Sequence, residues 1–303
     1  METIEQFVGS GISTIDELKA ALQLAMQLEF ATIPPYLCAQ WSIKSDPSRV
    51  EIVIHSIVSQ EMEHLALVGN LLTAIGGTPA VSTSKFIPHY PLGELPGGIK
   101  LSRRLHLRGL TRDQVERFME VEHPQFPPVA FLEMNAATIG EFYDTIIEGF
   151  KTVNPTMDSA ANRISVDFAP ELAQISDAIA TIERVKIEGE GLKDSPEQPV
   201  YDRSVYAHYY LFKEVFVGRR LVHDSSGWSF TGEPVAFPEA HQLNSRRSRS
   251  KEQAQFRAVL RTLLEGIEAC WTKGDAFNVA TMFELGIVGR ALARNQIVPD
   301  FSF

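Results

Sequence analysis

Glu61 and His64 are the residues of this sequence whose types and spacing most directly suggest chemistry. They lie three positions apart in SQEMEHLALVGNLL (59–72) and therefore project from the same face of a helix. Ile57, Val68 and Leu72 share that face, which indicates that it is buried. A bound metal ion can offset the cost of burying such a carboxylate. Bundle helices hold carboxylate-bridged metal pairs with Glu-x-x-His, although the motif also occurs by chance on solvated helices.

Glu29 is a second carboxylate on an otherwise apolar helical face. The residues that share its face include Leu22, Met26, Ile33 and Tyr36. A hydrogen bond from a tyrosine or from a backbone donor would satisfy this carboxylate without a metal. Two helices that each bury a glutamate, one of them with a histidine, nevertheless match the first half of a di-metal bundle. We therefore expect Glu29 to face the Glu-x-x-His pair.

The second half of such a site requires a further glutamate and histidine, and the sequence leaves the choice open. Glu141 lies in the middle of a predicted helix, on a face that is only partly apolar. The next predicted helix contains no Glu-x-x-His but carries Glu183, Glu188 and Glu190. His208 lies on the apolar stripe of a separate helix, where a histidine is more often a hydrogen-bonded core residue than a ligand.

Composition limits the classes of protein to which the chain can belong. Its 303 residues carry a formal net charge of -10, with a sequence pI of about 5.3, which disfavours binding to nucleic acid or to anionic membranes. Cys38 and Cys270 are the two cysteines, and they show no metal-site spacing. The N-terminus is too polar for a signal peptide, and no apolar run is long enough to span a bilayer. We therefore expect a soluble, cytoplasmic protein.

Helical periodicity covers most of the chain and predicts an all-α protein. The first long helix follows a capping box at Thr14 and Glu17, and Pro34 and Pro35 should kink it or end its first section. The second long helix should run over residues 47–75 and end at a pair of glycines, before a Pro- and Gly-rich loop with short extended pieces. The further predicted helices cover residues 111–124, 127–153, 170–191, 201–218, 251–274 and 277–296.

Seven segments are distinctive in combination. They are LQLAMQLEFATIPPYLCAQWSI (22–43), EMEHLALVGNLLTAIGGTP (61–79), HYPLGELPGG (89–98), TIGEFYDTI (138–146), EGEG (188–191), AHYYLFKEV (207–215) and LLEGIEACWTKGDAFNVATMFELGIVGRAL (263–292). Together they resemble the ferritin-like domain of the iminophenyl-pyruvate dimer synthase family, whose members act in bisindole pigment pathways of the violacein and rebeccamycin type. The pathway enzymes are much longer, so the resemblance covers essentially this whole chain but only the ferritin-like portion of those enzymes.

The resemblance implies a fold and a metal centre. The implied fold is a ferritin-like four-helix bundle with additional C-terminal helices and a long loop crossover. It forms one domain, with a core bundle at about 13–220 and a closing helical pair at about 250–297. The implied metal is iron, as one or two ions, and a carboxylate-rich site with two imidazoles also suits manganese or zinc. Glu188 is less favoured as a ligand because relatives have a glutamine there. The positions that match the family's ligands are Glu29, Glu61, His64, Glu141, Glu190 and His208.

The resemblance also implies a function. Its pathway members couple two imines derived from aromatic 2-oxo acids, so we expect a metal-dependent oxidoreductase that acts oxidatively on an aromatic small molecule derived from an amino or imino acid. One alternative is a non-catalytic ferritin-like protein that binds or stores metal. Another is a structural bundle whose buried carboxylates are satisfied without metal. The expected partner is a small-molecule substrate, with neither nucleic acid nor membrane, and the long apolar helices hint at a homodimer.

Overall fold

The computed structural model describes residues 3–44, 48–124, 138–192, 195–200, 203–225, 227–244 and 251–302. Within these ranges the chain forms nine helices and three antiparallel two-stranded hairpins, which confirms the predicted all-α class. The helices are α1 (Ile4–Ser10), α2 (Ile15–Ser42), α3 (Arg49–Ala74), α4 (Arg112–Val121), α5 (Ile139–Val153), α6 (Ile175–Glu190), α7 (His208–Val217), α8 (Lys251–Lys273) and α9 (Val279–Arg294). The strands are β1 (Leu92–Glu94), β2 (Lys100–Leu105), β3 (Glu197–Val200), β4 (Arg203–Tyr206), β5 (Val222–Asp224) and β6 (Gly227–Ser229).

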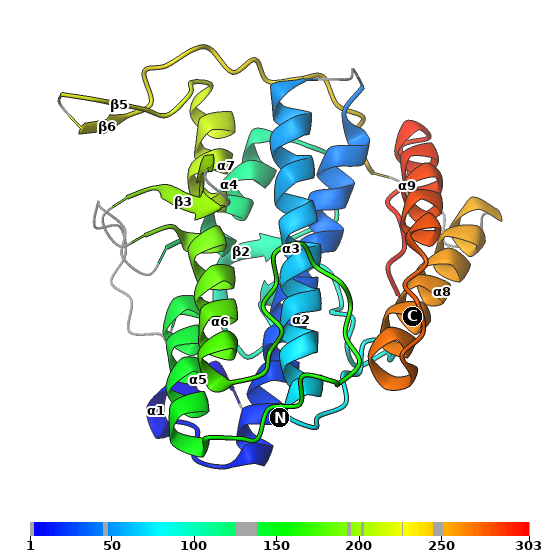
Figure 1. Ribbon diagram of the computed structural model, residues 1–303. Coiled ribbons are helices and arrows are strands. Elements are labelled where there is room, and N and C mark those ends of the chain that lie inside the picture. The colour runs from blue at the N-terminus through cyan, green and yellow to red at the C-terminus, as the bar shows by residue number, and fades with distance from the viewer. Residues whose placement is uncertain are drawn as a thin grey trace.

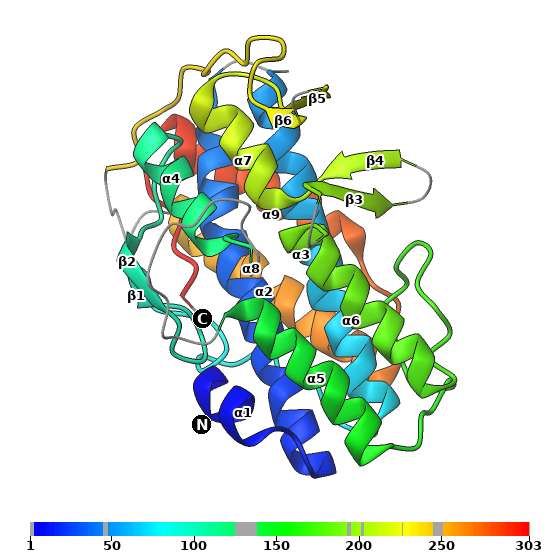
Figure 2. The ribbon, with the colours of Figure 1, turned by 90° about the vertical axis from the view of Figure 1, so that its left-hand side faces the viewer.

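The long helices α2 and α3 pack side by side through the centre of the molecule (Figures 1 and 2). Shorter helices cover one side of this pair. The helices α5 and α6 lie against one half of its length, and α4 and α7 lie against the other half. The covering layer is therefore interrupted midway along the bundle. The ends of α4 and α6 and the starts of α5 and α7 lie near that interruption (Figure 2).

The helix α2 does not end at Pro34 and Pro35, although the sequence predicted a kink or an end there. Because proline has no backbone N–H, Pro35 cannot bond the carbonyl of Ala31. The Tyr90 hydroxyl donates a hydrogen bond of 2.7 Å to that carbonyl from outside the helix. Burial of this part of α2 on all sides adds the packing that holds it helical through the prolines.

Two other predicted helices differ most from their predicted bounds. The helix predicted for residues 127–153 is described from Ile139, and residues 125–137 lie outside the described ranges. The helix predicted for residues 201–218 begins only at His208, because residues 203–206 pair with β3 as strand β4. The capping box at Thr14 and Glu17 is confirmed at the start of α2.

The helices α8 and α9 pack against the face of α2 and α3 that the shorter helices leave uncovered (Figure 1). Two glycines allow the close approach. A Cβ on Gly69 of α3 would lie 2.2 Å from the Trp271 ring of α8, and a Cβ on Gly289 of α9 would lie 2.3 Å from the Trp41 ring of α2. In the described part of the chain, no helix is both long and apolar enough to cross a membrane.

Candidate metal centre

Glu29, Glu61 and His64 meet in the interior between α2 and α3. Each lies near the middle of its helix, and their exposed fractions are 7%, 3% and 2%. His64 Nδ1 lies 3.3 Å from Glu29 Oε2 and 4.0 Å from Glu61 Oε1. One potential ligand atom from each residue lies within 4.8 Å of the others, so the three residues can hold a single cation.

Glu61 also belongs to a second group, which it forms with Glu122 and His208. Glu122 follows the last residue of α4, and His208 is the first residue of α7, so both lie at the interruption of the covering layer. His208 Nδ1 lies 2.8 Å from Glu61 Oε1 and 3.4 Å from Glu122 Oε2. Because its carboxylate is common to both groups, Glu61 could contribute to the binding of two neighbouring ions.

Both histidines direct Nδ1 to the centre and Nε2 away from it. His64 Nε2 lies 2.8 Å from Glu188 Oε2, and Arg184 Nε donates to the other oxygen of Glu188 at 2.9 Å. His208 Nε2 lies 3.1 Å from the amide oxygen of Gln60. These acceptors place a proton on each Nε2. The lone pair of each neutral imidazole is then on Nδ1, where a metal would bind.

Three hydroxyl groups orient the carboxylates. Thr32 Oγ1 donates to Glu61 Oε2 at 2.7 Å, and the Tyr36 hydroxyl donates to Glu122 Oε1 at 2.5 Å. The Tyr143 hydroxyl donates to Glu29 Oε1. Burial and the neighbouring carboxylates raise the pKa values of both tyrosines well above their usual range, so both remain protonated donors.

Without metal, Glu61 and the two imidazoles hold protons more tightly than usual. Burial and the charge of Glu122 raise the pKa of Glu61 to about 7. Burial alone would lower the pKa of His208, but Glu122 and Glu61 raise it to about 9. Burial also opposes protonation of His64, but Glu188 and Glu29 raise its pKa well above the usual range. The centre therefore attracts positive charge, which protons supply in the absence of a metal ion.

The structure places the remaining predicted ligands at different distances from the centre. The Glu141 carboxylate accepts from the backbone N–H of Thr138 at 2.8 Å in the capping box of α5 and is in neither metal-ligating group. Glu190 lines the cavity that contains the centre but is also in neither group among the described residues. Glu188 lies against the outer nitrogen of His64, where it orients the imidazole ring of that candidate ligand.

Glu122 is the member of the centre that the sequence interpretation missed. Glu122 falls in the short helix predicted for residues 111–124, from which the sequence prediction took no ligand. A signal was present, because Val115, Phe118 and Glu122 recur at helical spacing on one face and Val115 and Phe118 are fully buried. Glu122 is thus a third case, after Glu29 and Glu61, of a carboxylate on an apolar helical stripe.

The residues present fit a metal pair. His208 is fully buried, and within the described part of the chain its Nδ1 has no hydrogen-bond partner of acceptable geometry, although Glu61 and Glu122 lie close to it. Such a nitrogen is costly unless a cation or a proton occupies the space beside it. Three carboxylates and two imidazoles form a donor set that suits iron or manganese.

Comparison with known proteins gives three findings. Residues 22–217, more than half of the chain, match the family model described as Ferritin-like. Dichlorochromopyrrolate synthase from Lentzea aerocolonigenes is 22% identical, in an alignment that covers 68% of this chain but only 26% of that enzyme. The crystal structure of a ferritin-like protein from Caulobacter vibrioides matches with a TM-score of 0.73 and 19% identity, over 96% of this chain and 100% of the other.

Proposed function

The chain belongs to the Ferritin-like family, and we propose that it is an iron-dependent oxidoreductase that acts on an aromatic small molecule derived from an amino or imino acid. The family match and the solved structure confirm the ferritin-like fold that the sequence resemblance implied. The observation that carries the proposal is the pair of buried carboxylate–histidine groups that share Glu61.

Five residues would hold the metal in this proposal. Glu29 and His64 would bind one ion, Glu122 and His208 would bind the other, and Glu61 would lie between them. When bound, iron would supply the redox chemistry, in which the substrate loses two electrons and two protons and O₂ is reduced to hydrogen peroxide. The outward hydrogen bonds of the two histidines fix their ring orientation for this role.

Two adjacent cavities suggest where the substrate binds. The cavity at the centre has a volume of about 50 Å³, which is too small for an aromatic substrate. It shares Lys186 and Glu190 with an outer pocket of about 260 Å³ between α5 and α6. The Lys186 ammonium, paired with Asp144 at 2.6 Å, places a positive charge at this boundary. We therefore assign the outer pocket to the substrate, with Lys186 beside its carboxylate and Glu190 positioned to accept a proton.

The relative supports a role in small-molecule biosynthesis. Dichlorochromopyrrolate synthase is by its name a biosynthetic enzyme, and its similarity covers 68% of this chain. The chain corresponds to about a quarter of that enzyme's length, so the activity of the whole relative passes to this chain only as part of the proposal.

The first test is the metal content of protein purified without chelator, with Glu61→Ala in parallel. We expect about two equivalents of iron in the wild type and little in the variant, because the shared carboxylate is lost from both groups. Aerobic turnover is then measured with 2-imino acids generated from tryptophan and phenylalanine, with catalase present. A folded wild type without transition metal would refute the proposal. Bound iron without turnover would favour the metal-storage alternative.

A further inference from the structure

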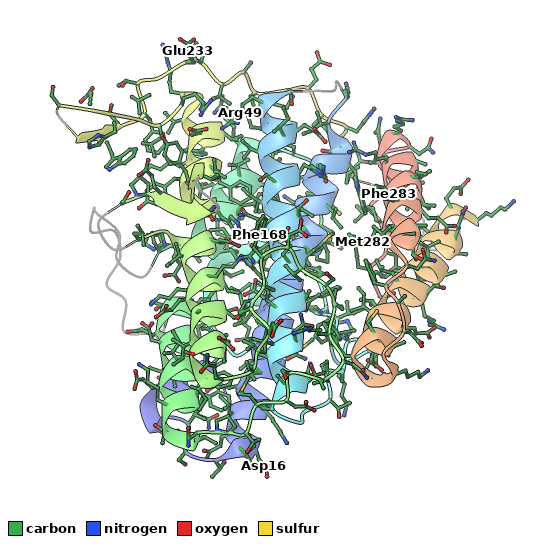
Figure 3. The ribbon with its side chains drawn as sticks, viewed as in Figure 1. Asp16, Arg49, Phe168, Glu233, Met282 and Phe283 are labelled. Atoms are coloured by element: carbon green, nitrogen blue, oxygen red, sulfur yellow. The ribbon has the colours of Figure 1, made fainter. Side chains whose placement is uncertain are left out.

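A cavity separate from both the metal centre and the outer pocket, the second cavity, lies on the opposite side of α2 and α3 from the metal centre. Its volume is about 390 Å³, and its walls come from α2, α3, α8, α9 and the connection between α5 and α6. This connection passes in front of α3 (Figure 1), and Figure 3 shows Phe168 of the connection and Met282 of α9 at the same level of the molecule. None of the residues that line it lines the cavity at the metal centre.

The spacing along α2 and α3 separates the two cavities. On α2, Ile33 and Leu37 line the second cavity, while Glu29 and Thr32 line the metal centre. On α3, Met62, Leu65 and Ala66 alternate in the same way with Glu61 and His64. The two helices thus form a wall with a polar face toward the metal centre and an apolar face toward the second cavity.

The walls of the second cavity are fixed in place by hydrogen bonds. Asn70 of α3 accepts from Trp271 Nε1 at 2.9 Å and exchanges two bonds of 2.8 Å with the backbone of Ile164. Thr73 Oγ1 donates to the carbonyl of Asn162 at 2.9 Å. One buried amide therefore holds both α8 and the α5–α6 connection against α3. A cavity with walls of this kind is pre-formed for a ligand.

The lining of the second cavity points to one class of ligand. Aromatic rings of Phe30, Trp271 and Phe277 contribute to walls that are mostly apolar. The charged residues in the lining are Glu63 and Asp167, and no lysine or arginine belongs to it in the part of the chain that the structure describes. A positively charged group on a ligand would be attracted to these two carboxylates.

From this combination we infer that the second cavity binds a small aromatic molecule that carries a primary amine. The aromatic ring occupies the apolar part between α3 and α8, and the ammonium group lies beside Glu63 and Asp167. The volume lies within the range of about 300–1,000 Å³ that is typical of small-molecule sites. A carboxylate on a ligand of the same shape would meet two like charges and bind more weakly.

Arg184 connects this site to the metal centre. Its Nη2 donates to Glu63 Oε2 at 2.9 Å, and its Nε donates to Glu188 Oε1 at 2.9 Å. Glu188 in turn holds His64 through a contact of 2.8 Å. An ammonium group that pairs with Glu63 competes with Arg184 for the same oxygen. Occupation of the second cavity therefore alters how firmly Glu188 orients His64, and metal in the centre alters amine binding to the same degree.

The binding test compares tryptamine with indole-3-propionate by titration calorimetry, because the two ligands share an indole ring and differ in charge. We expect tryptamine to bind one site per chain and the carboxylate to bind about tenfold more weakly. Asp167→Asn should weaken tryptamine binding about fivefold, and Glu148→Gln on the exposed face of α5 should leave it unchanged. Failure of both ligands to bind, or equal binding of the two, would overturn the inference.

A second experiment measures the coupling between the second cavity and the metal centre. The visible spectrum of bound Co²⁺ reports the affinity of the centre for that ion. Saturating tryptamine should change the dissociation constant of Co²⁺ about fivefold, and Glu63→Gln should abolish that change. A Co²⁺ affinity that does not respond to bound tryptamine would contradict the connection through Arg184. The binding arm needs neither metal nor turnover, so its failure would leave the proposed oxidoreductase function untouched.

Discussion

The side chains at the centre show how similar carboxylates acquire different roles from their neighbours. Glu61 and Glu122 both face His208, so a cation shared between them stabilises both carboxylates. Glu188 also contacts a histidine, but Arg184 already neutralises it, and the pKa of Glu188 is lowered despite its burial because His64 and Arg184 stabilise the charged form. The Glu141 carboxylate accepts from the backbone N–H of Thr138, the N-cap residue of its own helix. Residue type alone does not assign these roles.

Replacement of Glu122 by glutamine tests the second group at the residue scale. The amide keeps an acceptor for the Tyr36 hydroxyl but is a poor metal ligand, so we expect Glu122→Gln to remain folded and to lose about one of two metal equivalents. Glu141→Gln is the matched control, because glutamine also completes a capping box, and it should keep both equivalents. Metal analysis of both variants checks this. A loss of metal in Glu141→Gln but not in Glu122→Gln would reverse the assignment.

The apolar stripes of the sequence predicted part of this centre for a physical reason. Glu29, Glu61 and His64 lie within long helices, where neighbours at helical spacing reveal burial. Glu122 lies just after the end of α4, so its place beside His208 depends on how α4 packs against α7. That packing joins segments far apart in the chain, so helical spacing could indicate that Glu122 is buried but not that it lies beside His208. The resemblance implied Glu141 and Glu190 by position alone, and position does not show that the Glu141 carboxylate also caps α5.

At the scale of the elements, α2 must stay helical through two prolines so that Glu29 and Thr32 keep their register opposite α3. The Tyr90 hydroxyl takes over the bond to the Ala31 carbonyl that Pro35 cannot make. The sequence indicated a break at the prolines because this partner comes from a loop 59 residues away from Ala31 along the chain. The helix that carries Glu29 therefore depends on a contact outside itself.

A double-mutant cycle measures this dependence. Tyr90→Phe leaves the Ala31 carbonyl without its partner, so we expect a loss of about 1–3 kcal/mol in the free energy of unfolding. In a Pro35→Ala background, the alanine N–H can bond the same carbonyl, and Tyr90→Phe should then cost clearly less. Denaturant titrations of the four proteins give the coupling. Equal costs in the two backgrounds would show that Tyr90 acts through packing alone.

At the scale of the whole molecule, the centre joins α2, α3 and the ends of α4 and α7. Its five candidate ligands span residues 29–208, so a bound metal pair would cross-link most of the bundle. Because metal binds the folded state and not the unfolded chain, removal of the metal should lower the melting temperature of the whole bundle. The helices α8 and α9 supply no ligand within the described ranges, and they contribute the outer wall of the second cavity.

The stabilisation by metal should depend on pH, with a sign that follows from the two shifted groups. In the metal-free protein Glu61 has a pKa of about 7 against an ordinary 4.5, and His208 has a pKa of about 9 against an ordinary 6.5. Because both folded pKa values are raised, the folded state holds these protons more tightly than the unfolded chain. The stability that they contribute is full at low pH and is lost as the pH rises from 4.5 to about 9.

Metal binding must displace those same protons. The affinity for metal therefore rises with pH over the range in which the metal-free protein loses stability. The difference in melting temperature between protein with excess Mn²⁺ and protein with chelator should therefore widen from pH 6.5 to about 9. Scanning calorimetry across this range measures it, and His208→Ala should flatten the trend because one of the displaced protons is gone. A difference that stays constant with pH in the wild type would mean that metal and protons do not compete for the same nitrogen and oxygen atoms.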